Sequence, residues 1–172
     1  VLGIALSLNY NLSYTAPAAV ILANTDATST NTGINLEAPV FEPAVLTFMP
    51  PSKLQSYIEK ITNSFKQDKV SFIAANLSTM HIEYYKNGEV VWQAPILTKG
   101  KDGSWWETTA GVYKIENKSE RHFSSFGHVY TPWNLQFQGN FFIHGWPTYP
   151  DGNPVSSQFS GGCIRLRDTD AE

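Results

Sequence analysis

The chain has 172 residues and a mass of 19.1 kDa, which is enough for one domain with an extension but not for two full domains. Its 12 basic and 15 acidic residues give a formal net charge of −3, which argues against a basic nucleic-acid-binding protein. A single cysteine, Cys163, excludes an intrachain disulfide and a cysteine-rich zinc module. Hydrophobic residues make up 42% of the chain, so a sizeable core can form.

Residues 1–51 differ from the remainder in charge, because Asp26, Glu37 and Glu42 are the charged residues before Lys53. The apolar run at residues 1–8 is too short to span a bilayer, which needs about 20 residues. We interpret residues 1–51 as the remnant of a signal peptide or membrane anchor followed by a low-complexity linker. This interpretation predicts an extracytoplasmic protein of the cell envelope, exported or tethered to the membrane through this segment. The alternative is that the apolar run is a strand of a longer protein.

Residues 52–69 predict one amphipathic helix. Ser52 is expected to be its N-cap, with Gln55 as the partner in a capping box. Apolar residues then recur at helical spacing, at Leu54, Tyr57, Ile58, Ile61 and Phe65. We expect the helix to end near Lys66 and to serve packing rather than chemistry.

From residue 70 onward the apolar pattern becomes that of β-strands. Strands are expected at residues 70–77, 80–85, 89–97, 111–116 and 140–144. Asn87-Gly88 predicts a tight turn between the second and third of these, because both residue types tolerate a positive φ. Strands and helices do not alternate, which predicts a mainly β, mostly antiparallel fold with little helix beyond the first. Asp168 is expected to cap a further helix near the end of the chain.

The last 30 residues carry a candidate nucleophile site built on Cys163 and His144. A cysteine attacks as the thiolate, and an adjacent histidine can lower the thiol pKa from about 8.5 by forming a thiolate–imidazolium pair. Gly161 and Gly162 allow backbone N–H groups to converge on a developing oxyanion, and Arg165 adds a permanent positive charge. A lone cysteine is more commonly a small buried hydrophobe, but this combination favours a nucleophile.

The motif resembles that of the L,D-transpeptidase catalytic domain (YkuD-type), a family of cysteine enzymes that cross-link the cell wall. The family pattern is a His-Gly pair, a loop, and then Ser-x-Gly-Cys, Ile or Val, and Arg. Its counterparts here are His144, Gly145, Ser160, Gly162, Cys163, Ile164 and Arg165. Residues 108–113 are also similar to the family's Thr-Pro-x-Gly-x-Phe/Tyr segment, with Thr109 in place of the usual proline.

The resemblance covers residues 70–172, which we therefore assign to the catalytic domain. It implies a β-rich sandwich or barrel-like fold. Family members usually continue beyond the point at which this sequence stops, so we expect the domain to be truncated at its C-terminus.

The resemblance further implies a mechanism. Cys163 would attack the amide carbonyl at the L-centre of meso-diaminopimelate in a peptidoglycan tetrapeptide stem, and the terminal D-alanine would leave. His144 would accept the thiol proton, the Gly145 carbonyl would orient the imidazole, and the N–H groups of Gly162 and Cys163 would form much of the oxyanion hole. An acceptor amine on a second stem would complete a 3→3 cross-link, without a cofactor, and carbapenems are the implied inhibitors.

Other residues near the motif have two interpretations each. Arg165 either binds a substrate carboxylate or braces the cysteine loop, and we favour bracing. Ser160 is expected to bond within that loop. Trp146, Tyr130 and Trp133 are candidate walls of a substrate cleft, although aromatic residues on strands more often belong to a core. The histidines lack the spacing of metal ligands, so no metal site is predicted.

Three alternative functions remain open at this stage. Water as the acceptor would make the protein an L,D-carboxypeptidase. A sortase-like transpeptidase also uses His, Cys and Arg, but Gly-Gly-Cys-Ile-Arg fits its pattern poorly. An inactive wall-binding module would be expected to have lost the cysteine or the histidine, and both are present.

Overall fold

The structure is a computed structural model that describes residues 19–23 and 50–172 of the chain. The described elements, in chain order, are β1 (Ala19–Ala23), α2 (Pro51–Gln67), β2 (Phe72–Asn76), β3 (His81–Lys86), β4 (Glu89–Pro95), β5 (Gly111–Lys114), β6 (Asn117–Ser124), β7 (Val129–Gln138), β8 (Phe141–His144), β9 (Ile164–Arg165) and α3 (Asp168–Ala171). The expectations for residues 1–18 and 24–49 lie outside the described residues. The mainly β fold predicted from the sequence is confirmed, with one long helix before most of the strands.

The first sheet has the strand order β4-β3-β2-β1-β5. Strands β2, β3 and β4 form the antiparallel meander predicted from the sequence. The turn between β3 and β4 is also as predicted, since Asn87 and Gly88 have φ values of 54° and 84°. The strand β1 was not predicted, and it lies between β2 and β5, antiparallel to the first and parallel to the second.

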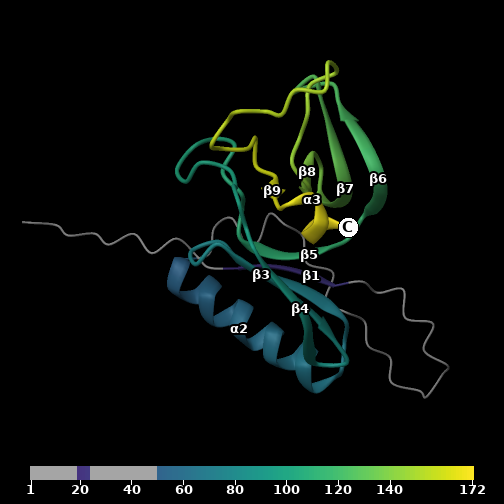
Figure 1. Ribbon diagram of the computed structural model, residues 1–172. Coiled ribbons are helices and arrows are strands. Elements are labelled where there is room, and N and C mark those ends of the chain that lie inside the picture. The colour runs from purple at the N-terminus through teal and green to yellow at the C-terminus, as the bar shows by residue number, and fades with distance from the viewer. Residues whose placement is uncertain (1–18, 24–49) are drawn as a thin grey trace, which may run out of the picture.

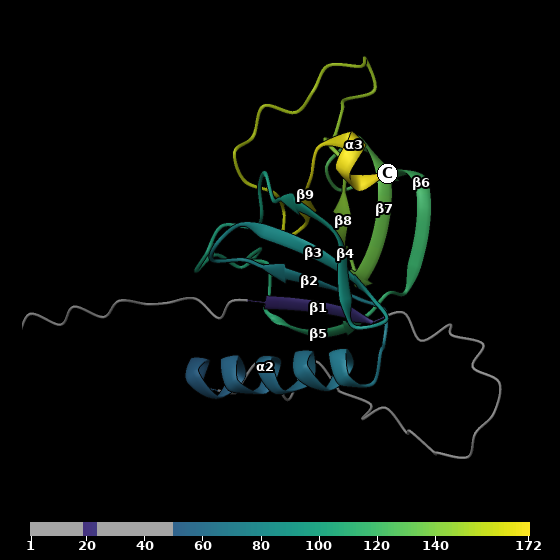
Figure 2. The same cartoon turned by 60° about the horizontal axis from the view of Figure 1, so that its bottom comes forward.

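The helix α2 covers the outer face of the first sheet, as Figures 1 and 2 show. Its residues Leu54 and Ile58 are buried with Phe72 and Tyr85, whose rings stack at 4.4 Å. The amphipathic helix is therefore confirmed. Its predicted capping box is wrong, because the N-cap position is Pro50 and makes no side-chain cap bond.

The helix begins two residues before the start that a Ser52 N-cap would give, because a proline fits its first turn. Pro51 has no N–H to satisfy, and its fixed φ suits the N1 position. The capping-box partner Gln55 instead donates from Nε2 to Glu59 Oε1 at 2.9 Å, one turn along the helix. The helix ends at Gln67, one residue after the expected end.

The second sheet has the strand order β6-β7-β8-β9 and lies on the other side of the first sheet from α2 (Figure 2). Apolar side chains of both sheets fill the space between them, among them Ala75, Ile82, Phe137, Ile143 and Ile164. Neighbouring strands in the second sheet are antiparallel except for β8 and β9, which are parallel. This parallel pair brings the histidine and cysteine segments together.

The short helix α3 follows β9 and contacts β7 and β8. The prediction that Asp168 is its N-cap is wrong, because the N-cap position is Arg167 and Asp168 is the first helical residue. The carboxylate of Asp168 accepts a hydrogen bond from the distant Trp146 N–H instead of capping its own helix. Within the described residues, no helix combines the length and the apolar composition needed to cross a bilayer.

Candidate active site

The register of β8 and β9 places the proposed base, His144, beside Arg165, which is two residues after the proposed nucleophile, Cys163. His144 is paired with Arg165, and Cys163 immediately precedes β9. Side chains two residues apart along an extended chain point to the same face, so we expect Cys163, one residue before β9, to share the face of Arg165 and His144.

His144 is buried, with 3% of its surface exposed, and its ring is held by the next residue. Its Nδ1 lies 2.5 Å from the carbonyl oxygen of Gly145. A carbonyl oxygen can only accept, so Nδ1 carries the proton and Nε2 of the neutral ring has a free lone pair. Burial lowers the pKa of His144 to about 4, and the charges of Arg165 and His122 act in the same direction, so the imidazole is neutral at pH 7.

Cys163 is half-buried, and its thiol contacts the residue just before β8. The Sγ atom donates to the carbonyl oxygen of Asn140 at 3.7 Å. Burial raises the pKa of the Cys163 thiol, although the Phe142 N–H and the charge of Arg165 oppose that effect. The ion pair expected from the sequence is therefore absent: in residues 50–172 no hydrogen bond joins Sγ to the His144 ring, and both groups are neutral at pH 7.

The loop before Cys163 is held by hydrogen bonds to the hydroxyl of Ser160, a residue that is itself buried. Ser160 Oγ accepts from the Gly162 N–H at 3.1 Å and donates to the Cys163 carbonyl at 2.5 Å. The predicted bonding of Ser160 within its loop is therefore present. The Gly162 N–H already has an acceptor in this conformation, which leaves the Cys163 N–H as the stronger candidate for an oxyanion donor.

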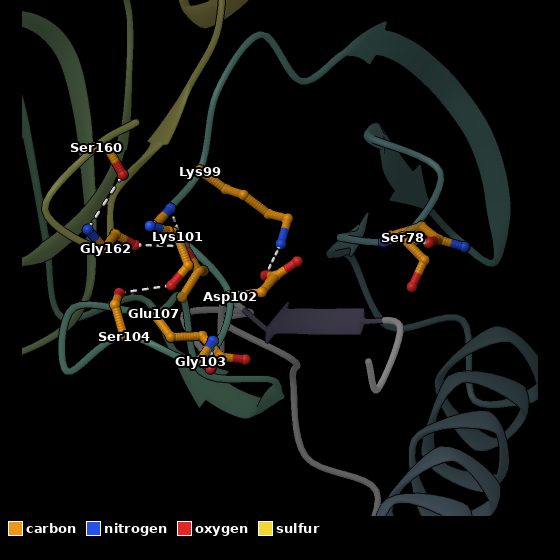
Figure 3. Close-up of polar contacts among 12 residues, drawn as sticks. Ser78, Lys99, Lys101, Asp102, Gly103, Ser104, Glu107, Ser160 and Gly162 are labelled. Carbon is orange, nitrogen blue, oxygen red and sulfur yellow. Dashed lines mark hydrogen bonds and ion pairs between the residues drawn. The ribbon is translucent and has the colours of Figure 1, made fainter. Parts of the chain in front are cut away.

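Thr108 makes a second set of hydrogen bonds to this region; it is 3% exposed and lies in the loop before β5. Its hydroxyl accepts from the Gly100 N–H at 2.9 Å and donates to the Gly162 carbonyl at 2.8 Å. The loop at residues 99–107 consequently lies beside the loop at residues 160–162, as Figure 3 shows. Ser160 also donates its N–H to the Lys99 carbonyl at 3.0 Å.

Of Gly161 and Gly162, only Gly162 has a backbone conformation that requires a glycine. Its φ is +107°, and a Cβ atom there would lie 2.5 Å from Cδ1 of Phe141. Its neighbour Gly161 has open space around the corresponding position. The two glycines therefore differ in function: Gly162 permits the conformation that precedes the cysteine, whereas Gly161 does not have to be glycine for steric reasons.

The L,D-transpeptidase catalytic domain family model matches residues 71–172, which is more than half of the chain and contains all of the residues above. The chain belongs to this family. Among solved structures, the L,D-transpeptidase of Stackebrandtia nassauensis is 24% identical with a TM-score of 0.44, and the match covers 54% of this chain and 42% of that one. A fused zinc-dependent amidase, peptidase and peptidoglycan-binding domain-containing protein of Clostridium acetobutylicum is 20% identical with a TM-score of 0.43, covering 55% and 41%.

A mutant form of the L,D-transpeptidase of Enterococcus faecium is 24% identical with a TM-score of 0.40, covering 55% of this chain and 40% of that one. The chain thus spans about two fifths of the length of these solved structures. No curated protein is significantly similar to it in sequence.

In this L,D-transpeptidase domain, Arg165 contacts the loop between His144 and Cys163. The residue is buried, and its Nη1 donates to the Ser157 carbonyl at 3.1 Å. Its guanidinium lies 5.5 Å from the ring of Trp146, whose Nε1 donates to the Val155 carbonyl at 2.9 Å. These contacts tie Arg165 to the loop, as the bracing interpretation expects, but its buried Nε makes no hydrogen bond within the described residues, so carboxylate binding also stays a prediction.

The other two aromatic candidates, Tyr130 and Trp133, lie on β7 and are half-buried. Tyr130 pairs through its backbone with Thr148 of the loop, and its ring is covered by Arg121 at 3.9 Å. Trp133 has a φ of +54°, which marks an irregularity in the strand. None of the described contacts joins either ring to Cys163.

Two residues that contact the candidate site were missed by the sequence analysis. Thr108 was quoted only as part of a motif, and its contact with Gly162 spans 54 residues of chain. Asp168 was assigned to a helix cap, and its contact with Trp146 spans 22 residues. Among the residues that the structure describes, no group of three or more His, Cys, Asp or Glu side chains could hold a metal ion.

Proposed function

We propose that the protein is a peptidoglycan L,D-transpeptidase that works through an acyl-enzyme on Cys163. The observation that supports the proposal is the pairing of His144 with Arg165, two residues after Cys163, with His144 Nδ1 bound to the Gly145 carbonyl. This arrangement leaves Nε2 unprotonated and able to act as the base. The three parts of the site are then the Cys163 nucleophile, the His144 base and a backbone carbonyl that orients the base.

In the first step, Sγ of Cys163 attacks the carbonyl carbon of the third residue of a donor tetrapeptide stem. The S–C bond forms, the C–N bond to the terminal D-alanine breaks, and the thiol proton passes through Nε2 of His144 to the leaving amine. The product is a thioester and free D-alanine.

The neutral resting state determines how this step proceeds. Burial raises the pKa of the Cys163 thiol and lowers that of His144 to about 4, so a standing thiolate–imidazolium pair is disfavoured. Proton transfer to His144 therefore accompanies the attack of the thiol on the bound substrate. The thiol also has to turn away from the Asn140 carbonyl to reach the substrate.

The negative charge that develops on the substrate oxygen is stabilised by the Cys163 N–H. The Gly162 N–H contributes if the substrate draws it from Ser160 Oγ, its acceptor in this conformation. In the second step the amine of a neighbouring stem attacks the thioester, gives its proton to His144, and forms the 3→3 cross-link as the thiol is regenerated.

The partners in this proposal are donor and acceptor peptidoglycan stems, which place the protein in the cell envelope, outside the cytoplasm. An N-terminal tether to the membrane is part of the same proposal. Carbapenems, which acylate nucleophiles of this kind, are the proposed inhibitors.

The test is an assay with purified disaccharide-tetrapeptides, analysed by liquid chromatography and mass spectrometry. The parent protein is expected to form dimers with a 3→3 link, and the Cys163→Ala and His144→Ala variants are expected to form none above background. Dimers made by the variants as fast as by the parent would refute the proposal.

The same assay separates the alternative acceptor. Tripeptides and free D-alanine without dimers would identify water as the acceptor and the protein as an L,D-carboxypeptidase. Neither product from a folded parent, together with no meropenem adduct on Cys163 by intact-protein mass spectrometry, would favour an inactive wall-binding module. The family match favours this chemistry over the sortase-like alternative.

A further inference from the structure

The peptide unit between Gly145 and Trp146 is held at both of its polar ends. Its carbonyl oxygen lies 2.5 Å from His144 Nδ1. Its N–H, which belongs to Trp146, donates to Oδ1 of Asp168 at 2.6 Å. One planar unit thus connects a carboxylate on α3 to the imidazole at the end of β8.

Planarity makes the two bonds interdependent. The C=O and N–H of a trans peptide point in opposite directions and rotate together. An acceptor that holds the N–H on one side therefore fixes the direction of the carbonyl on the other. A charged acceptor also polarises the peptide, which strengthens the carbonyl as an acceptor for the imidazole N–H.

The packing around Asp168 supports a specific contact, although much of this side chain is exposed. Its Oδ1 lies directly against the backbone of Gly145, at a position where a Cβ atom on Gly145 would collide with it. The same Cβ atom would also lie 2.8 Å from Cγ of Pro132. The Gly145 N–H also donates to the Pro132 carbonyl at 2.9 Å, so the residue is fixed between β7 and α3.

We propose that Asp168 is a positioning residue for His144, acting through the Gly145–Trp146 peptide to hold the imidazole in its Nδ1–H tautomer. In this tautomer Nε2 is the unprotonated nitrogen, which is the state that a base for the Cys163 thiol requires. The importance of Asp168 as a base-orienting group rests on the proposed function. The tautomer itself is a property of the free protein.

The same short helix provides a matched control. Asp170 also lies on α3, but its carboxylate pairs with Arg167, with Oδ2 accepting from Nε at 2.6 Å. Removing the Asp170 carboxylate changes the charge of the helix by the same amount and leaves the Trp146 N–H contact in place. A difference between the two substitutions therefore reports the peptide contact and not the helix charge.

The experiment is nitrogen-15 NMR of the imidazole of His144 at pH 7, without substrate, together with the rate of Cys163 acylation by meropenem. The parent is expected to show a protonated Nδ1 and an unprotonated Nε2. In Asp168→Ala the ring nitrogens should shift toward a mixture of tautomers, and acylation should slow about tenfold to a hundredfold, as for other groups that orient a reacting side chain. Asp168→Asn, whose amide oxygen can still accept from Trp146 N–H, should retain the tautomer, as should Asp170→Ala.

An Nε2–H tautomer in the parent overturns the proposal, and this result needs no variant to fold. Fast amide exchange of the Trp146 N–H in the parent overturns it as well, because that N–H would then lack its acceptor. Parent-like shifts and an acylation rate within about twofold of the parent in a folded Asp168→Ala variant would give Asp168 a purely structural role.

Failure of the proposed function is a different result. A parent protein with the Nδ1–H tautomer, but without cross-linking or D-alanine release, would refute the transpeptidase proposal and leave the effect of Asp168 on the imidazole intact.

Discussion

Lowering the pH from 7 to 4 is expected to destabilise the domain through the buried imidazole of His144. Burial lowers the pKa of His144 to about 4, whereas an unperturbed histidine has a pKa of about 6.5. Between these two values the unfolded chain binds a proton that the folded domain does not. The free energy of unfolding therefore falls as the pH falls from about 6.5 to about 4.

The size of the effect follows from the distance between the two pKa values. Folded and unfolded values of about 4 and 6.5 differ by about 2.5 pH units, which corresponds to about 3 kcal/mol once the pH has reached the lower value. Above pH 7 the ring is neutral in both states and the contribution vanishes. A loss of this size is a substantial part of the stability of a small domain.

The assay is urea unfolding, followed by tryptophan fluorescence, at pH 7, 6, 5 and 4 for the parent and for His144→Gln. Glutamine does not titrate, and the carboxylates titrate in both proteins, so the difference between the curves isolates the histidine. The parent should lose about 3 kcal/mol more than the variant between pH 7 and pH 4. Parallel curves would refute the account of a buried neutral imidazole.

Three further predictions concern the cysteine loop. Gly162→Ala should lower the free energy of unfolding by about 2–4 kcal/mol in denaturant, because Gly162 has a φ of +107° and a Cβ atom there would collide with Phe141. Gly161→Ala should change the free energy of unfolding by less than about 0.5 kcal/mol, and equal costs for the two variants would contradict the geometry. Thr108→Val should lower the free energy of unfolding by about 1–3 kcal/mol, because it leaves two backbone groups unpaired. Thr98→Val removes a buried hydroxyl that has no partner in the described part of the chain, so it should leave the stability unchanged or raise it; the reverse order of the two variants would refute the reasoning. The rate of Cys163 alkylation by iodoacetamide should still increase above pH 9, because burial raises the pKa of the thiol. A rate that is already constant by pH 7 would indicate that the resting cysteine is a thiolate.

The parts of the fold that could be predicted are those with a local sequence signal. The hairpin at Asn87-Gly88 follows from two residues that accept a positive φ, and the apolar spacing of α2 follows from the face that it buries. In the same way, His144 and Cys163 were singled out because the chemistry of a nucleophile site requires a base and a thiol near backbone donors, and their catalytic roles stay predictions.

The missed strands lack such a signal, each for a physical reason. Strand β6 is largely exposed along its length, so its sequence shows no alternation of apolar and polar residues. Strand β7 contains Pro132, which argues locally against a strand, and the positive φ at Trp133 has no sequence signal because tryptophan ordinarily favours strands. Strand β1 is a five-residue apolar run whose partners, β2 and β5, are distant in sequence.

The missed site residues depend on tertiary contacts of the same kind. An aspartate before a short helical pattern is typical of an N-cap, and nothing near Asp168 in the sequence indicates that its acceptor role is toward Trp146. The protonation state of the site was also beyond the sequence, because the neutral form of His144 and of Cys163 follows from their burial.

The central claim is that Cys163 carries the acyl group, and trapping that intermediate tests it most directly. The parent is incubated with a disaccharide-tetrapeptide donor in the absence of an added acceptor, quenched in acid, and examined by intact-protein and peptide mass spectrometry. The account predicts an adduct with the mass of the donor less D-alanine, located on Cys163 and absent from Cys163→Ala. Release of D-alanine by Cys163→Ala at the parent rate, or an adduct on another residue, would contradict it.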